Sequence, residues 1–381
     1  MTVYRRKRSL GRLFMVMALV LGSATTVFAQ AGPIVAKEER SFIFRNHAYI
    51  PQEKQVAVVN LASGKLASIY RAKHYIHDFA ASGQYLFLAN DTAGVRMLDM
   101  TNPGRLTPVS LIPASPGFAA KYVHVVEHRG GLVTRQLFVT EYTRGQWQLS
   151  IYDVTTPTRP RFKGKKALPG QASNSTALIA SLDARHILVS LYTVGVLILD
   201  VQDPANVTVV KTLPRTGGAT GLVVKNKRAY VRTGLSTSQS RLAIWDLSNL
   251  ANPRELNRIL INSAAGDSNN LSVRRRGGRR YAFMGGCCGA GYNSEEFIVV
   301  DVTNPANPRQ KRLRLHHPAG FDVVVYDVDI VGNRAYVSGW KPPEPPKFQY
   351  DYYLVEIDIS TPMNPGIIGF TKVPAGRVVA R

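Results

Sequence analysis

Residues 297–308 read Phe-Ile-Val-Val-Asp-Val-Thr-Asn-Pro-Ala-Asn-Pro, and variants of this stretch recur along the chain. In each variant a run of aliphatic and β-branched residues ends at an acid or amide, and a turn rich in Thr, Ser, Asn and Pro follows. This acid or amide stands at Asn60, Asp99, Asp153, Asp200, Asp246, Asp301 and Asp358. An Asp side chain accepts backbone hydrogen bonds two residues on, and Pro presets the turn. The pattern therefore predicts strands that end in tight turns, and its regular recurrence favours turn-making over catalysis.

Each copy of the motif follows a pair of predicted strands that a short polar turn connects. In the second unit these strands are 79–81 and 85–89, and in the last unit they are 323–330 and 334–337. A fourth strand follows each motif. The spacing of roughly 40 to 55 residues fits propeller blades, whereas most solenoid repeats are shorter. The sequence thus predicts an all-β fold, a seven-bladed β-propeller of four-stranded antiparallel blades.

Two strings of the chain resemble a known repeat. Phe-Ile-Val-Val-Asp-Val at 297–302 and Val-Leu-Ile-Leu-Asp-Val at 196–201, together with hairpins that carry Ala-Tyr-Val, resemble the LVIVD repeat of exported and surface proteins of bacteria and archaea. The resemblance extends over residues 42–371. It implies a β-propeller and says little about activity, because the repeat is a blade scaffold without a catalytic signature. The first blade departs most, since it carries Asn60 and Gly64 where most copies carry Asp and Pro.

The N-terminus has the pattern of an export signal. Five basic residues between positions 5 and 12 precede an apolar run at 13–21, and Val27-Phe-Ala29 matches a small-x-small cleavage site before Gln30. The apolar run is shorter than the roughly 20 residues that span a bilayer. A mature protein without a transmembrane segment is therefore expected in the periplasm or outside the cell. The expected regions are a signal peptide at 1–29, a linker or closing strand at 30–40, the propeller at 41–372 and a C-terminal tail at 373–381.

The chain is strongly basic. It contains 48 Lys and Arg against 25 Asp and Glu, a formal net charge of +23, and loss of the five basic residues of the signal leaves +18. Such an excess attracts anionic partners, with an affinity that falls as salt rises. The expected partner is an envelope or extracellular protein, or an anionic polymer. Nucleic acid is less favoured, because no aromatic residues are interleaved with the basic turns. A solvated charged rim is the alternative.

Long irregular segments collect on one face of the predicted disc. If the strands of a blade run outward from the axis, the links between second and third strands and between blades share one face, which we call the loop face. The hairpin turns and the Asp turns share the other, the turn face. Irregular loops on a rigid scaffold are where binding usually occurs. The ligand-binding candidates of the loop face are His77, Asp78, Asn270, Cys287, Cys288, Tyr292, Tyr326, Asp327 and Trp340.

Cys287 and Cys288 are the only cysteines, and glycines flank them. In an oxidising compartment each thiol has the other as its nearest partner, which favours a disulfide between these neighbours. Two alternatives remain. One is a soft metal or redox site, which would need further donors, and the other is a pair of free thiols.

His77-Asp78 and Tyr326-Asp327 occupy matching places in the second and seventh blades. They form either a polar cluster at the channel mouth that is capable of acid–base chemistry, or one more hydrogen-bonding feature of the repeat. The histidines show no metal-ligand spacing of a recognised type, so neither a metal nor a cofactor is expected.

The sequence contains no nucleophile elbow, phosphate-cradling loop or zinc-protease helix. A non-enzymatic role is therefore favoured: an exported binding or scaffolding protein of the cell envelope that recognises a protein, glycan or other anionic partner through loops on one face. The alternative is an enzyme with a site at the channel mouth, either a polysaccharide lyase or hydrolase, or a metal-dependent oxidase that uses His77, Cys287 and Cys288. Only analogy of fold supports this alternative.

Overall fold

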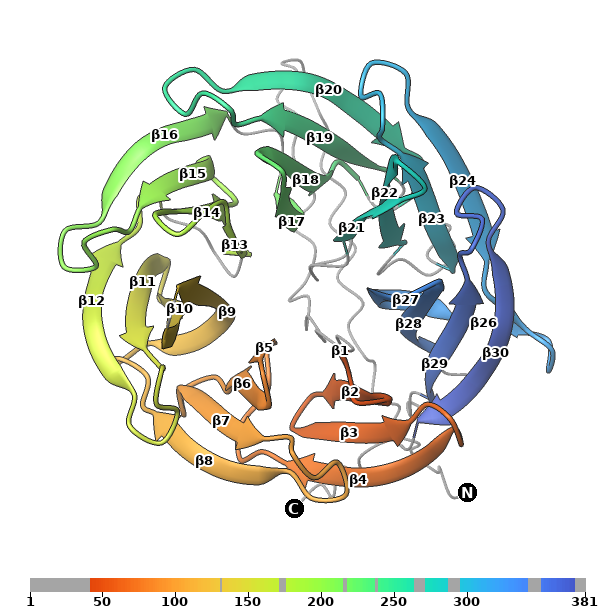
Figure 1. Ribbon diagram of the computed structural model, residues 1–381, viewed down its shortest axis with the longest axis horizontal. Helices are drawn as coiled ribbons and strands as arrows, with labels where there is room; N and C mark the ends of the chain where they lie inside the picture. Colours follow the sequence, from red (N-terminus) through yellow and green to blue (C-terminus); the bar gives the residue numbers. More distant parts are fainter. Residues whose placement is uncertain are drawn as a thin grey trace, which may run out of the picture. The chain divides into compact units, whose positions relative to one another are not determined.

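The chain folds into a ring of seven four-stranded antiparallel sheets (Figure 1). The computed structural model describes residues 42–130, 132–170, 176–214, 218–236, 239–263, 271–286, 295–341 and 351–373. Each sheet pairs four strands that are consecutive in the sequence, and the first strand of each lies at the central channel. The prediction of a seven-bladed β-propeller is therefore confirmed. Within the described ranges, no helix is long and apolar enough to cross a membrane.

Within each blade the strands follow chain order from the innermost to the outermost. Blade 1 contains β1 (Phe42–Phe44), β2 (His47–Gln52), β3 (Gln55–Asn60) and β4 (Lys65–Arg71). Blade 2 contains β5 (Asp78–Ser82), β6 (Tyr85–Ala89), β7 (Val95–Asp99) and β8 (Thr107–Ile112). Blade 3 contains β9 (Ala119–Gly130), β10 (Leu132–Thr143), β11 (Gln146–Asp153) and β12 (Arg161–Ala167). Blade 4 contains β13 (Ile179–Ser181), β14 (His186–Leu191), β15 (Gly195–Asp200) and β16 (Thr208–Pro214).

The remaining three blades follow the same order. Blade 5 contains β17 (Ala219–Lys225), β18 (Arg228–Gly234), β19 (Ser240–Asp246) and β20 (Arg254–Ile261). Blade 6 contains β21 (Leu271–Arg276), β22 (Arg279–Gly285), β23 (Glu296–Asp301) and β24 (Arg309–Arg314). Blade 7 contains β27 (Val324–Val331), β28 (Arg334–Lys341), β29 (Asp351–Asp358) and β30 (Gly366–Val373).

The recurring motif forms the third strand of every blade, and its acid or amide makes the turn that follows. In all seven copies a side-chain oxygen of this residue accepts the backbone N–H two positions on, at 2.7 to 3.1 Å. Asn60 of the divergent first blade makes the same bond to Ala62. The turn-making role predicted for these residues is therefore confirmed.

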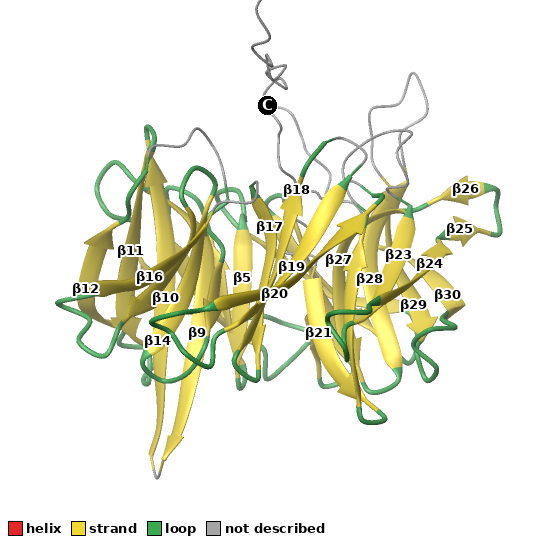
Figure 2. Ribbon diagram, turned by 90° about the horizontal axis from the view of Figure 1, so that it is seen from above, coloured by secondary structure: helices red, strands yellow, loops and turns green. Residues whose placement is uncertain are grey.

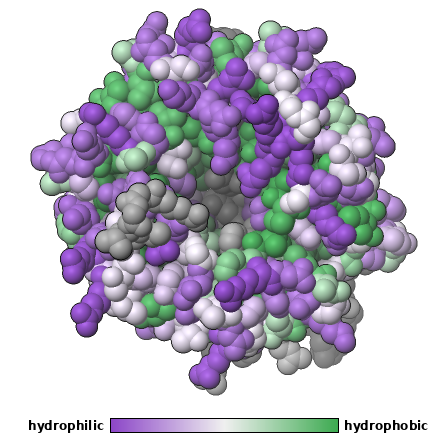
Figure 3. Space-filling model, viewed as in Figure 1, coloured by the Kyte–Doolittle hydropathy of each residue, from purple (hydrophilic) through white to green (hydrophobic). Residues whose placement is uncertain are grey.

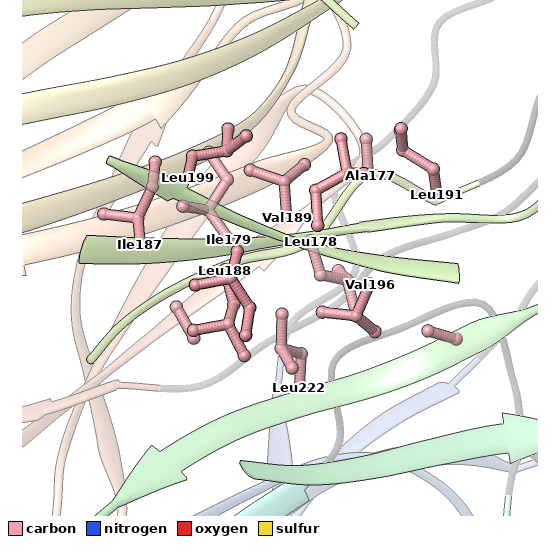
Figure 4. Close-up of a cluster of buried hydrophobic side chains, with 14 of the residues drawn as sticks. Ala177, Leu178, Ile179, Ile187, Leu188, Val189, Leu191, Val196, Leu199 and Leu222 are labelled. Atoms are coloured by element: carbon pink, nitrogen blue, oxygen red, sulfur yellow. The ribbon is translucent and has the colours of Figure 1, made fainter. Parts of the chain in front are cut away.

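The hydrophobic core lies between neighbouring blades. The largest cluster contains Leu188 and Val196 of blade 4 with Leu222 of blade 5, and Figure 4 shows these three side chains on the same side of the blade 4 sheet, with Val189 and Leu199 on its other side. Because a blade is covered on both faces, its inner strands read as nearly continuous apolar runs instead of alternating ones.

Among the described strands, the first and last blades of the ring pack against each other and exchange no strand. Ala57 and Val59 of blade 1 pack in one cluster with Tyr352 and Leu354 of blade 7. At the channel, the backbone N–H of Ile43 donates to Asp329 Oδ2 at 3.2 Å.

Two segments on the loop face are regular. Residues 141–147 are the end of a hairpin, in which β10 and β11 meet at a tight turn with positive φ at Arg144 and Gly145. Strands β9 and β10 also extend beyond the disc (Figure 2). His316-His317 form the short strand β25, which pairs with β26 (Phe321–Asp322). The ring of His317 stacks on Phe321 at 4.3 Å, and this local contact orders the segment.

Candidate functional site

Three titratable side chains meet on the loop face, beside the central channel. His77 precedes β5, Asp91 lies in the link between β6 and β7, and Lys121 lies near the start of β9. Nε2 of His77 is 2.8 Å from Lys121 Nζ and 3.1 Å from Asp91 Oδ1. Lys121 Nζ also donates to Asp91 Oδ1 at 3.0 Å. We call these three residues the mouth cluster, and they connect blade 2 to blade 3.

The backbone around the cluster holds it in place. Asp91 has a positive φ of 52°, and its carbonyl oxygen accepts the N–H of Ala120 at 3.0 Å. This backbone hydrogen bond places the carboxylate of Asp91 beside Lys121, the residue after Ala120. The ring of His77 packs against Tyr75 with 4.8 Å between their centroids. The side chains of His77, Asp91 and Lys121 are 20%, 29% and 19% exposed, so a molecule at the mouth can reach all three.

The electrostatics keep His77 neutral. Burial is the main cause that lowers its pKa, and the charge of Lys121 adds to it, while the hydrogen bond to Asp91 opposes both. The hydrogen bond to His77 holds the pKa of Asp91 below its usual range, with a further contribution from Lys121. Nε2 of a neutral ring either accepts from Lys121 or donates to Asp91, and it cannot do both at once. The cluster can therefore redistribute a proton or present an ammonium group to a ligand.

A cavity of about 260 Å³ lies in the channel wall next to the cluster. Residues 78–81 of β5, 123–125 of β9 and Leu178-Ile179 line it. His124 Nε2 is 3.2 Å from Ser181 Oγ, and burial, with the charge of Lys225, lowers the pKa of His124 to about 4. Figure 3 shows hydrophilic residues over the rim of the ring around a central hollow.

The comparisons with known proteins agree with this architecture. The LVIVD repeat model matches residues 291–312, which contain β23 and the turn after it. Residues 291–312 therefore match an LVIVD repeat, and the seven-bladed propeller in which they lie fits the predicted LVIVD-repeat family. No curated protein matches it in sequence.

Solved structures resemble this propeller in fold. A hypothetical selenium-binding protein from Sulfolobus tokodaii is 13% identical, with a TM-score of 0.55 and coverage of 86% of this chain and 91% of that chain. The dihydro-heme d1 dehydrogenase NirN in complex with DHE is 19% identical, with a TM-score of 0.51 and coverage of 86% and 64%. The computationally designed Ika8 protein is 8% identical, with a TM-score of 0.50 and 88% of both chains covered. At these identities the likeness is one of fold alone.

In the matching pairs predicted for blades 2 and 7, each aspartate makes the same kind of backbone hydrogen bond. Asp78 Oδ1 accepts the N–H of Phe79 at 2.6 Å, and Asp327 Oδ1 accepts the N–H of Val328 at 2.8 Å. Asp78 Oδ2 also accepts the N–H of Val123 in blade 3, at 3.0 Å. These bonds favour the structural interpretation of both aspartates, whereas His77 belongs to the mouth cluster.

The other candidates are distributed around the ring. The rings of Tyr326 and Trp340 lie 6.1 Å apart in blade 7. Asn270, Cys287, Cys288 and Tyr292 lie outside the described residues, as does the predicted disulfide. Among the residues that are described, no three His, Cys, Asp or Glu side chains are grouped to hold a metal.

The sequence analysis missed Asp91 and Lys121. Asp91 begins an Asp-Thr-Ala-Gly segment that has the composition of an ordinary turn, and Lys121 is one of 48 basic residues. Their position in the predicted fold could have indicated them, since all three residues of the mouth cluster lie in or next to links of the loop face.

Proposed function

We propose that this protein is an exported binding propeller of the cell envelope that recognises an acidic partner, a glycan or a protein segment, at the channel mouth. The observation that carries the proposal is the mouth cluster: His77, Asp91 and Lys121 come from three separate segments and meet within hydrogen-bonding distance beside a cavity.

The chemistry of the cluster suits a carboxylate or a sugar hydroxyl. Lys121 supplies an ammonium group, and His77 and Asp91 supply acceptors, so an acidic sugar finds both kinds of partner within a few ångströms. The cavity of about 260 Å³ lies at the small end of ligand pockets, which suits one residue of a longer partner. The net charge of +18 after loss of the signal would draw such a partner to the protein.

Export is part of the same proposal. The signal at 1–29 would direct the chain out of the cytoplasm, and the mature protein would begin at Gln30 in the periplasm or outside the cell. Acidic polysaccharides and the acidic segments of envelope proteins are accessible there.

Retention on an immobilised acidic glycan tests the proposal. The mature chain should bind a polygalacturonate column at low salt, and Lys121→Gln should elute at clearly lower salt. The control is Lys227→Gln, which removes the same charge from an exposed turn on the opposite face. Identical elution of the two variants would show that bulk charge, and not the mouth, retains the protein.

A second function is favoured by one observation, the contact of a neutral imidazole with an ammonium and a carboxylate. Asp91 would orient His77, and His77 would remove a proton from the carbon next to a uronate carboxylate, as in a polysaccharide lyase. The electron pair would form a carbon–carbon double bond as the glycosidic C–O bond breaks, and the ammonium of Lys121 would protonate the leaving oxygen. Ultraviolet absorbance of unsaturated products after incubation with polygalacturonate would report this reaction. Product formation that His77→Gln abolishes would make the protein an enzyme. A stoichiometric redox metal in the purified protein would instead favour the oxidase alternative.

A further inference from the structure

A second polar cavity lies between blades 5 and 6, on the turn face. Its volume is about 330 Å³, and its lining residues are Lys225, Asn226, Val273, Arg274, Arg275 and Arg280. Lys225 ends β17 and His77 precedes β5, so the two sites lie at opposite ends of the innermost strands. We call this cavity the basic crevice.

The alternation of side chains along the strands explains why the basic groups converge there. Val223 of β17 packs in the cluster between blades 5 and 6, so Lys225, two residues on, points toward blade 6. Val273 of β21 packs in the same cluster, so Arg275 points toward blade 5. Arg280 donates to the hydroxyl of Tyr230 in blade 5 at 3.3 Å. The crevice is therefore a space between two sheets with cations on both walls.

The charges in the crevice are poorly compensated. Arg275 and Arg280 are directly opposite in the register of β21 and β22, an arrangement of like charges that destabilises a sheet. Burial and the charge of Arg274 lower the pKa of Lys225. The acidic partner of Arg274 is Asp329, and the distance from Nη2 of Arg274 to Oδ1 of Asp329 is 3.9 Å. Among the described residues, no carboxylate lines the crevice or pairs with Arg275, Arg280 or Lys225.

We propose that the basic crevice binds a phosphate group. Guanidinium groups offer paired donors that match phosphate oxygens, and the ammonium of Lys225 adds a point charge. A phosphate dianion has three terminal oxygens and therefore uses more of these donors than a carboxylate does. The volume of about 330 Å³ leaves room for a phosphate group together with several waters, because one water occupies roughly 30 Å³ in the liquid.

A bound phosphate would relieve the repulsion within the crevice, so binding and stability are coupled. In thermal unfolding, inorganic phosphate should raise the Tm of the mature protein in a saturable way, and sodium chloride at the same ionic strength should not. Arg275→Gln/Arg280→Gln should abolish the saturable increase. In the absence of phosphate this variant should be at least as stable as the wild type, because the opposed pair is gone.

The matched control is Lys211→Gln/Lys311→Gln, which removes two exposed positive charges from the outer strands β16 and β24 and should keep the full response to phosphate. An equal response in all three proteins, or no difference between phosphate and chloride in the wild type, would overturn the proposal. If the double arginine variant does not fold, Lys225→Gln serves instead. Calorimetry should then show at least about tenfold weaker phosphate binding, since one charge-assisted contact is lost.

Vesicles distinguish the two sources of such a phosphate. If the protein co-sediments with phosphatidic acid vesicles and free phosphate abolishes this co-sedimentation, the ligand of the crevice is a lipid headgroup. Phosphate binding without vesicle binding would assign it to a soluble phosphate compound, and both results support the site. Vesicle binding that survives Arg275→Gln/Arg280→Gln would count against it. Neither the phosphate experiment nor the vesicle experiment depends on Lys121 or His77. A negative result here therefore leaves the proposal for the channel mouth untouched, and the reverse also holds.

Discussion

At the scale of single residues, the channel of this propeller holds two histidines that burial keeps neutral. His77 contacts Asp91 and Lys121, whereas His124 contacts Ser181 deeper in the channel. Their pKa values are lowered for the same main reason, loss of water around the charged ring. A neutral histidine at the mouth can accept a proton or a hydrogen bond, so the chemistry available there depends on pH.

The stability of the fold should consequently depend on His124 below neutral pH. Its pKa is about 4 in the folded protein and near 6.5 in an unfolded chain, so the unfolded state binds the proton first as pH falls. The stability that the neutral ring contributes is present above about pH 6.5 and is lost toward pH 4, by on the order of 1–3 kcal/mol.

Urea unfolding at pH 7 and pH 4.5 measures this loss. The free energy of unfolding should differ less between the two pH values in His124→Gln than in the wild type. In His128→Gln, a control on the same strand, the difference should be that of the wild type. An identical pH dependence in all three proteins would exclude a role for His124. His77 should contribute in the same direction, because its pKa is also lowered.

At the scale of strands and turns, local sequence decides most of the structure. The Asp of each motif bonds to a backbone N–H two residues away, so the sequence alone sufficed to predict the turn and the strand before it. Contacts between distant segments were not predictable in this way. Residues 77, 91 and 121 meet only because the ring places two links beside the start of β9.

Asp301 should be the most sensitive of the turn residues. Its carboxylate is 4% exposed, accepts from Thr303, and lies within 3.3 Å of both Arg279 and Arg309. Asp301→Ala should lower the free energy of unfolding by about 1–3 kcal/mol, because the N–H of Thr303 and two arginines lose a charged acceptor. Asp301→Asn should cost less, since an amide oxygen still accepts from Thr303, as Asn60 does in blade 1.

Denaturant unfolding of the two variants and of Asp358→Ala measures this order. The carboxylate of Asp358 bonds to Ser360 in an exposed turn, so its loss should have the smallest effect. If Asp301→Ala and Asp301→Asn lower the free energy of unfolding equally, the amide oxygen that Asp301→Asn retains does not contribute to stability.

At the scale of the whole molecule, the repeat predicted the number and order of the blades, because each blade is a continuous segment of the chain. The way in which the ring closes was not predictable, since nothing in a single repeat specifies whether the ends exchange a strand or pack face to face. Blades 1 and 7 pack, and Ala57, Val59 and Leu354 lie in the interface between them.

Leu354→Ala should therefore weaken the closure of the ring. The side chain is 3% exposed, and its truncation should cost about 2–5 kcal/mol through lost burial and the resulting cavity. Leu66→Ala is the matched control, because Leu66 is 40% exposed on the outer strand of blade 1. Thermal unfolding compares the two, and a similar small decrease in Tm for both would show that the last interface adds little to stability.

The two faces of the disc should also differ in what they bind. The loop face carries the mouth cluster and the turn face carries the basic crevice, so an acidic glycan and a phosphate compound could bind one molecule of the protein at the same time. A propeller with a different site on each face can bring two anionic ligands together.

Calorimetric titration of the mature protein with a short oligogalacturonate tests the central claim, that the mouth cluster recognises an acidic partner. The wild type and Arg275→Gln/Arg280→Gln should bind with equal affinity, whereas Lys121→Gln should bind about tenfold more weakly, because it loses one charge-assisted hydrogen bond. Binding that persists unchanged in Lys121→Gln, or that disappears in the double arginine variant, would contradict a recognition site at the channel mouth.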